Sequence, residues 1–342
     1  MPDWVDLQAE DRRELLLQAA GQIGRQPAVL EKDVWVVQTL SWIAGSRWAG
    51  DLVFKGGTSL SKAYRAIDRF SEDIDLTHDI RRLVPEVEGR EPDPIPGSKS
   101  QEKKWTGTAK RALEDWIRGE FMPAIAEAAG HWGARVEVEE SEGSLLIHYP
   151  PALAEAPDCL RTAVKLEFGG RATGEPADWM PIACDIAGVI PEEVRLPSAR
   201  VRTMSASRTF WEKVTAMHVH CRQTRPTAER FARHWFDVAC LHRKEICGDA
   251  LTDRDLAARV VEFKRYFFRP SAKYGDVDLG ECIDGRLRVL PEGDHADGLR
   301  GDYEAMRNAG YLGEAWHPDW DEVLAVVAEV QERVNQAFRH SS

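Results

Sequence analysis

The chain has 342 residues, of which 43% are hydrophobic and 30% are charged. This length exceeds one average domain, so we expect two or three packed units. No stretch approaches the roughly 20 apolar residues of a membrane helix, and the first residues lack the basic-then-apolar pattern of a signal peptide. The formal net charge of −12 argues against a protein that coats nucleic acid through its global charge. We therefore expect a soluble, cytoplasmic protein without membrane association.

A local basic groove is still compatible with this acidic total, because electrostatic steering depends on where the charges lie. The candidate residues are Arg222, Arg225, Arg230 and Arg233. The alternative is a solvated helix face that carries scattered arginines. Composition leaves both interpretations open.

The first 80 residues predict two helices followed by two short strands. Apolar residues at helical spacing indicate one helix within residues 8–23 and another that begins near residue 31. Residues 51–54 predict a buried strand that Gly56 and Gly57 end, and Thr58 or Ser59 is a suitable cap for the helix that follows. Residues 73–77 alternate at period two, which predicts a second strand.

The middle of the chain predicts a loop, a helix and three more strands. Residues 82–104 are rich in Pro, Gly and charge, and a strongly amphipathic helix follows from Trp105 to about Ile125. The strand-like segments are 134–140, 144–149 and 162–168. We expect the Pro- and Gly-bearing stretch 169–198 to lead out of the sheet. From about residue 205 the pattern is helical, ending in a helix from Trp320 to Phe338.

One series of predicted elements indicates a site for phosphate and metal binding. It consists of a strand, a Gly-Gly-Thr-Ser turn, a helix, and then Asp73 and Asp75 on the next strand. The turn lets backbone N–H groups approach a phosphate, and the following helix directs its positive end there. Two acids spaced by one residue on a strand share a face. Paired carboxylates attract a hard divalent cation such as Mg²⁺, which also binds triphosphate oxygens. The plain alternatives are a tight turn with a helix cap and a solvated strand edge.

Residues 54–76, FKGGTSLSKAYRAIDRFSEDIDL, closely resemble the signature of the AbiEii/AbiGii-type nucleotidyltransferase toxins of the polymerase-β-like superfamily. Three further segments resemble family elements in the same order: 31–40, 208–220 and 233–241. The resemblance implies an α+β fold, with a polymerase-β-like core of a mixed sheet and flanking helices, plus a helical C-terminal domain. We accordingly expect N-terminal helices packing on the core over 1–50, a core over 51–204 with a helical insert near 82–130, and a mainly helical domain over 205–342.

The resemblance also implies roles for individual residues. Gly56, Gly57, Thr58 and Ser59 match the phosphate-binding turn, and Asp73 and Asp75 match the metal carboxylates. Glu167 is the candidate third metal ligand, with Asp185 as the alternative. Lys165 matches a lysine that holds triphosphate charge, although an ordinary surface strand pair would also explain Lys165 and Glu167. Lys213 and Asp237 are candidate nucleotide ligands; the alternatives are a snorkelling lysine and an acid that fixes helix packing.

The implied activity is transfer of a nucleoside monophosphate from an NTP to an acceptor hydroxyl, with release of pyrophosphate. The expected metal is Mg²⁺, with Mn²⁺ as the alternative, and the expected acceptor is the 3′ end of tRNA. The family consists of toxins of bacterial toxin–antitoxin or phage-defence systems, so we expect a cognate antitoxin encoded by a neighbouring gene. Two alternatives remain: transfer to a protein or small-molecule hydroxyl, and a regulator that binds NTP without catalysis.

Overall fold

The computed structural model describes residues 1–90, 93–139, 143–153, 161–190, 193–224, 229–268, 277–313 and 315–339. The chain forms two compact units. The first comprises Met1–Ala63, Phe70–Pro92 and Lys104–Met204, and the second comprises Tyr64–Arg69, Asp93–Lys103 and Ser205–Ser342. The chain therefore passes into the second unit and back between the Gly-Gly turn and the paired aspartates.

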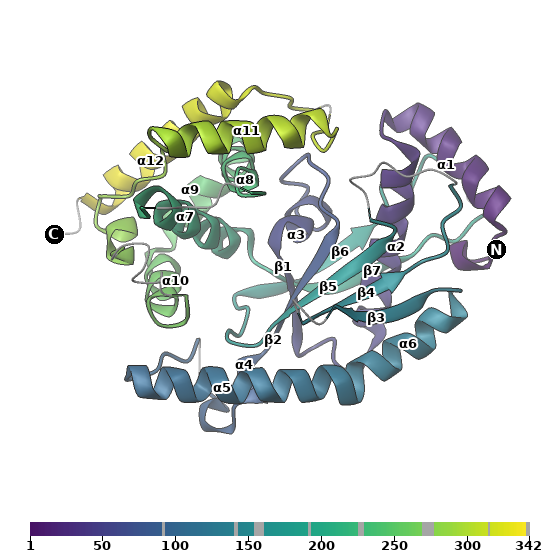
Figure 1. The fold of residues 1–342 in the computed structure, drawn as a ribbon, viewed down its shortest axis with the longest axis horizontal. Helices are drawn as coiled ribbons and strands as arrows, with labels where there is room; N and C mark the ends of the chain where they lie inside the picture. Colours follow the sequence, from purple (N-terminus) through teal and green to yellow (C-terminus); the bar gives the residue numbers. More distant parts are fainter. Residues whose placement is uncertain are drawn as a thin grey trace. The chain divides into compact units, whose positions relative to one another are not determined.

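A seven-stranded mixed sheet forms the centre of the first unit, in the order β3-β4-β5-β2-β1-β7-β6 (Figure 1). The strands are β1 Leu52–Lys55, β2 Asp73–His78, β3 Arg135–Glu139, β4 Ser144–His148, β5 Ala163–Gly169, β6 Ala177–Ala183 and β7 Ser198–Met204. The pairs β1–β7 and β2–β5 are parallel, and the other neighbouring strands are antiparallel. The strand that precedes the Gly-Gly turn, β1, and the strand that carries Asp73 and Asp75, β2, therefore lie near the middle of the sheet.

Helices flank this sheet. They are α1 Ala9–Ile23, α2 Pro27–Gly45, α3 Gly56–Lys62, α4 Ile80–Leu83, α5 Lys99–Trp116 and α6 Met122–His131, with a π-helical turn at Ile117–Phe121 and 3₁₀ turns at Trp4–Asp6 and Pro85–Val87. Pro27 begins α2, where its missing N–H has no intrahelical acceptor to satisfy. This helix packs against β7 and β5 and is apolar on most sides, which is typical of a helix inside the core. An aromatic cluster that includes Trp116, Phe121 and Phe168 fills the space between helix and sheet.

The second unit is helical. Its helices are α7 Ala206–Arg222, α8 Arg233–Arg243, α9 Ile246–Thr252, α10 Arg254–Phe267, α11 Asp294–Asn308 and α12 Trp320–Arg339, with a 3₁₀ turn at Leu279–Ile283. Ser205 caps α7 by accepting a hydrogen bond from the Arg208 amide at 3.1 Å. Trp211 and Trp235 are buried in this unit, and their indole N–H groups donate to the carbonyls of Ala250 and Val289.

The structure confirms the α+β class and the mixed sheet with flanking helices. Several local predictions are wrong. The stretch 169–198 does not leave the sheet, because it contains β6, which pairs with β7. Pro181 lies inside β6, and a proline is tolerated there because β6 is an edge strand. The expected cap at Thr58 or Ser59 is also wrong, since α3 begins at Gly56 and Lys55 occupies the cap position without a side-chain hydrogen bond.

The predicted loop at 82–104 is partly helical, since α5 already begins at Lys99. Among the described residues, no helix has the length and apolar character that crossing a membrane would require.

Candidate active site

Four predicted site residues lie on one face of two neighbouring strands. In the parallel pair formed by β2 and β5, Asp73 is the register partner of Lys165, and Asp75 is the partner of Glu167. Residues that are register partners, or that are two positions apart on a strand, point to the same side of a sheet. The fold therefore brings together two segments that are far apart in the sequence.

The carboxyl group of Asp75 on this face has a raised pKa. Burial raises its pKa to about 6; the positive charge of Lys55 opposes this shift, and the nearby carboxylates of Glu167 and Asp73 add to it. Asp75 and Glu167 also share a side-chain hydrogen bond. Two carboxyl groups this close share a proton more readily than they ionise together. Glu167 is in turn paired with Lys165 at 2.6 Å.

Gly56 lies directly against Asp75. Its φ of +77° is the left-handed region that disfavours side chains, and a β-carbon built on it would collide with Asp75 Oδ2. The glycine is thus required by the backbone conformation and by the space that the carboxylate occupies. The sequence had suggested only that a glycine here lets a phosphate approach the backbone.

Thr58 and Ser59 are fully buried, and their hydroxyl groups bond within the protein. Thr58 donates to the carbonyl oxygen of Asp73 and hydrogen-bonds Ser71 Oγ at 2.8 Å. Ser59 donates to the carbonyl oxygen of Gly56 at 2.9 Å. Thr58 therefore holds the turn against the start of β2, and Ser59 is bonded within the turn itself.

Lys55 belongs to this face and was missed by the sequence reasoning. It is the register partner of Asp75 in the antiparallel pair of β1 and β2, and it lowers the pKa of that acid. Its position on the strand immediately before the Gly-Gly turn was the available signal.

Lys213 on α7 and Asp237 on α8 lie in the second unit and contact each other at 2.9 Å. Arg69, which the sequence reasoning did not single out, donates two hydrogen bonds to the Asp237 carboxylate, at 2.6 and 2.8 Å. Burial alone would raise the pKa of Asp237, but the charges of Arg69 and Lys213 hold it well below its usual range. Burial also lowers the pKa of Lys213, against the opposing effect of Asp237.

Asp185, the alternative third acid, has cationic partners. It pairs with Lys62 and with Arg25, each at 2.6 Å. Glu167, whose carboxyl group bonds Asp75, is thus the better-placed third acid.

Two arginines of the candidate basic groove can be compared with the structure. Arg222 pairs with Glu281 at 3.2 Å, and Arg225 lies outside the described residues.

The carboxylates of this face fit a divalent cation in their chemistry. Oxygen ligands of this kind suit a hard ion, and such an ion would offset the burial and the repulsion that raise the pKa of Asp75. Among the residues that the structure describes, no three His, Cys, Asp or Glu side chains form a ready cluster for an ion. Asp75 and Glu167 are thus a pair of candidate ligands, and Asp73 is a further carboxylate on the same strand face.

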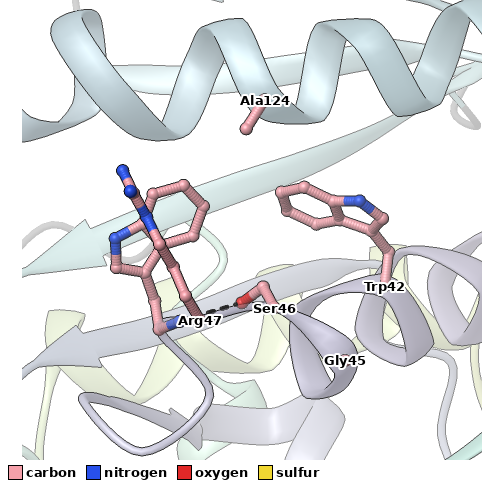
Figure 2. A pocket seen from close by; sticks show the side chains of 6 residues that line it. Trp42, Gly45, Ser46, Arg47 and Ala124 are labelled. Carbon is pink, nitrogen blue, oxygen red and sulfur yellow. Dashed lines mark hydrogen bonds between the residues drawn. The ribbon is translucent and has the colours of Figure 1, made fainter.

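A pocket of about 600 Å³ lies elsewhere in the first unit, at the end of α2 and beside α6 (Figure 2). It is lined by Trp42, Gly45, Ser46, Arg47, Trp48 and Ala124. The Arg47 guanidinium lies over the Trp48 ring at 4.6 Å. None of the candidate site residues described above lines this pocket.

Comparison with known families places the chain among the nucleotidyltransferases. The model of the nucleotidyl transferase AbiEii toxin family, type IV toxin–antitoxin system, matches residues 40–326. The chain belongs to this family, which makes it a nucleotidyltransferase toxin of a type IV toxin–antitoxin system. No curated protein matches the sequence.

Two solved structures are similar over nearly the whole chain. MenT4, nucleotidyltransferase toxin Rv2826c from Mycobacterium tuberculosis H37Rv, is 18% identical; the match covers 93% of this chain and 98% of that chain, with a TM-score of 0.37. A candidate nucleotidyltransferase from H. pylori is 14% identical; the match covers 92% of this chain and 96% of that chain, with a TM-score of 0.39. The family assignment comes from the sequence match alone.

Proposed function

We propose that the protein transfers a nucleoside monophosphate from an NTP to the 3′ hydroxyl of tRNA, using Mg²⁺ held by Asp73, Asp75 and Glu167. The observation that carries the proposal is the contact of Asp75 with Gly56 on one side and with Glu167 on the other. In this contact a carboxylate pair lies directly against the Gly-Gly turn. Phosphoryl transfer needs these two features at one place.

The chemistry of the carboxylates supports a divalent cation. Burial and the neighbouring carboxylates of Glu167 and Asp73 raise the pKa of Asp75, and a bound cation would stabilise its ionised form. Such an ion supplies charge neutralisation at the attacking and leaving oxygens. Mn²⁺ would bind the same oxygen ligands, and we propose it as the alternative to Mg²⁺.

The positive side chains around the pair support binding of a triphosphate. Lys165 and Lys55 lie in register with Asp73 and Asp75 on the same face. We assign Lys165 the role of holding triphosphate charge, and Gly56 and Gly57 the role of admitting the phosphates to the backbone. For Lys213 and Asp237, the buried ion pairs with each other and with Arg69 favour a role in holding α7 and α8 together.

In the proposed reaction, the acceptor hydroxyl oxygen forms a bond to the α-phosphorus while the bond from that phosphorus to the bridging oxygen breaks. The leaving group is pyrophosphate, and the hydroxyl proton passes to the Glu167 carboxylate. The chain's main contribution is the positioning of the reactants and the neutralisation of charge.

The proposed acceptor is tRNA because the resemblance of residues 54–76 to the AbiEii/AbiGii-type toxins implies transfer to the tRNA 3′ end. The proposed partner is an antitoxin encoded by a neighbouring gene. Binding of tRNA would use arginines at the start of the C-terminal helices, such as Arg233 of α8 and Arg230 in the turn before it.

Transfer of label tests the proposal. The purified protein is incubated with Mg²⁺, total bacterial tRNA and each α-³²P-labelled NTP in turn, with Asp75→Asn as the isosteric control. Label on tRNA that is absent with the variant and with EDTA is the expected result. Label on a protein or a small molecule would show that this molecule, and not tRNA, is the acceptor. Binding of NTP without any transfer would favour a regulator that binds NTP without catalysis.

A further inference from the structure

Three consecutive charged residues, Glu31, Lys32 and Asp33, are buried in the first half of α2, with only 3%, 1% and 4% of their surface exposed. Charged side chains are rarely buried to this extent unless they are paired. Successive helix residues point about 100° apart, so the three side chains leave α2 in different directions. Each of them therefore meets a different segment of the first unit.

Asp33 is bonded to the segment that carries the Gly-Gly turn. Its carboxylate forms an ion pair with Lys62, the last residue of α3, and accepts a hydrogen bond from the Asp185 amide at 2.7 Å. Lys62 also contacts the Asp185 carboxylate at 2.6 Å. Because α3 is only seven residues long and begins at Gly56, fixing its last residue fixes the turn.

Lys32 is bonded to the segments that carry the acids. Its ammonium group pairs with Glu72, which directly precedes Asp73, and donates to the Arg161 carbonyl oxygen at 2.8 Å. Arg161 lies two residues before β5. One buried side chain thus holds the beginnings of both β2 and β5.

Glu31 is bonded to a segment without site residues. It accepts a hydrogen bond from the Ala152 amide at 2.6 Å. Ala152 follows β4 and lies outside the strands that form the candidate site. Glu31 therefore provides an internal comparison for its two neighbours.

We infer that Lys32 and Asp33 are positioning residues of the active site, in which Asp33 sets the Gly56–Ser59 turn and Lys32 sets the strands that carry Asp73, Asp75 and Glu167. This inference rests on the proposed assignment of those residues to nucleotide and metal binding. A buried ion pair contributes little net stability compared with an apolar pair, but it specifies one geometry, because a displaced partner leaves a charge unpaired. A displacement of about 1 Å in a site of this kind costs on the order of 100-fold in rate.

Steady-state kinetics of isosteric variants test the division of roles. At a temperature where all variants are folded, Asp33→Asn should raise the KM for NTP by roughly tenfold or more, with a smaller change in kcat. Lys32→Met should instead lower kcat by roughly tenfold or more. Glu31→Gln should change neither parameter.

Asp79→Asn is the matched control outside the triplet. Asp79 is equally buried, and it pairs with Arg81, which in turn contacts Glu175, so its partners include no site residue. This variant should lose stability and keep its kinetic parameters. If all four variants lost activity only in proportion to their folded fraction, the inference would be wrong.

Hydrogen–deuterium exchange separates this inference from the proposed function, since it needs no catalysis. Asp33→Asn should increase exchange in peptides that cover residues 56–63, and Lys32→Met should increase it in peptides that cover 72–78 and 161–168. A wild-type protein without transfer activity would refute the proposed function, whereas the exchange pattern would still decide the positioning roles. Unchanged exchange in these segments would overturn the inference.

Discussion

The carboxylate of Asp75 occupies the space that a side chain at Gly56 would need. A β-carbon at that position would collide with Asp75 Oδ2, and the φ of Gly56 is +77°. The turn and the acid are thus fitted to each other across the antiparallel pair of β1 and β2. A change at position 56 therefore acts on the position of Asp75 as well as on the turn.

Gly56→Ala should reduce nucleotidyl transfer by about 100-fold or more, because the added methyl group displaces the Asp75 carboxylate. It should also destabilise the fold by about 1–2 kcal/mol, since a side chain at positive φ is strained. Transfer of labelled NMP and urea denaturation measure the two effects.

Gly188→Ala is the matched control for this substitution. Gly188 has a φ of +90°, and a β-carbon there would meet no atom within 4 Å. The control should show a similar loss of stability with unchanged transfer. Equal activity losses in both variants would contradict the role of the Gly56–Asp75 contact.

Asp75→Asn should stabilise the fold at pH 7 in the absence of divalent ions, by on the order of 3 kcal/mol. The folded-state pKa of Asp75, about 6, exceeds its ordinary value of 3.8, so the folded protein binds more protons than the unfolded chain between these values. Wild-type stability contributed by this group therefore falls as the pH rises from about 4 to about 6. The neutral amide of the variant does not ionise, so the variant does not lose this stability as the pH rises.

Thermal unfolding in EDTA at several pH values measures this effect. The Tm of Asp75→Asn should exceed that of the wild type above pH 6, and the difference should vanish towards pH 4. A variant that is less stable than the wild type at pH 7 would contradict the crowding of Asp75 by Glu167 and Asp73.

Asp237→Asn should have the opposite effect and destabilise the fold at neutral pH by about 3–5 kcal/mol, because Arg69 and Lys213 would stay buried with a neutral partner. The depressed pKa of Asp237 means that its contribution is present above the ordinary carboxyl range and is lost as the pH falls below it. Urea denaturation at pH 7 measures the change. Unaltered stability with loss of NTP binding would instead identify Asp237 as a nucleotide ligand.

Binding of tRNA should weaken steeply with salt. A locally basic surface that contacts phosphates releases counterions, so log affinity falls linearly with log salt concentration. Filter binding between 50 and 300 mM KCl, about the range in which such effects are large, measures the slope. A flat response would favour a protein or small-molecule acceptor.

The turn and the paired acids could be predicted from the sequence because they are local. Gly56 directly follows β1, Asp75 lies on the next strand along the chain, and period-two alternation places Asp73 and Asp75 on one face. The pairing of Asp75 with Glu167 could not be derived in this way, since it depends on the register of β2 against β5. Only the family resemblance suggested Glu167.

Buried charge was the main obstacle to prediction. The triplet at 31–33 has the composition of a solvated helix start, and its burial depends on partners such as Glu72 and Lys62 that the linear pattern does not reveal. Arg69 was missed for the same reason, because its partner Asp237 lies on α8. β6 was missed because Pro181 reads as a strand breaker, and only its edge position makes it acceptable.

The most direct test of the central claim is a crystal structure with Mn²⁺ and a non-hydrolysable NTP, with the ion located by its anomalous signal. We predict an anomalous peak within coordinating distance of Asp75, about 2.0–2.4 Å, with the triphosphate against the Gly56–Gly57 turn and Asp73 or Glu167 as a further ligand. An ion or a nucleotide bound elsewhere, with Asp75 still bonded to Glu167, would contradict the assignment of this face as the site of nucleotidyl transfer.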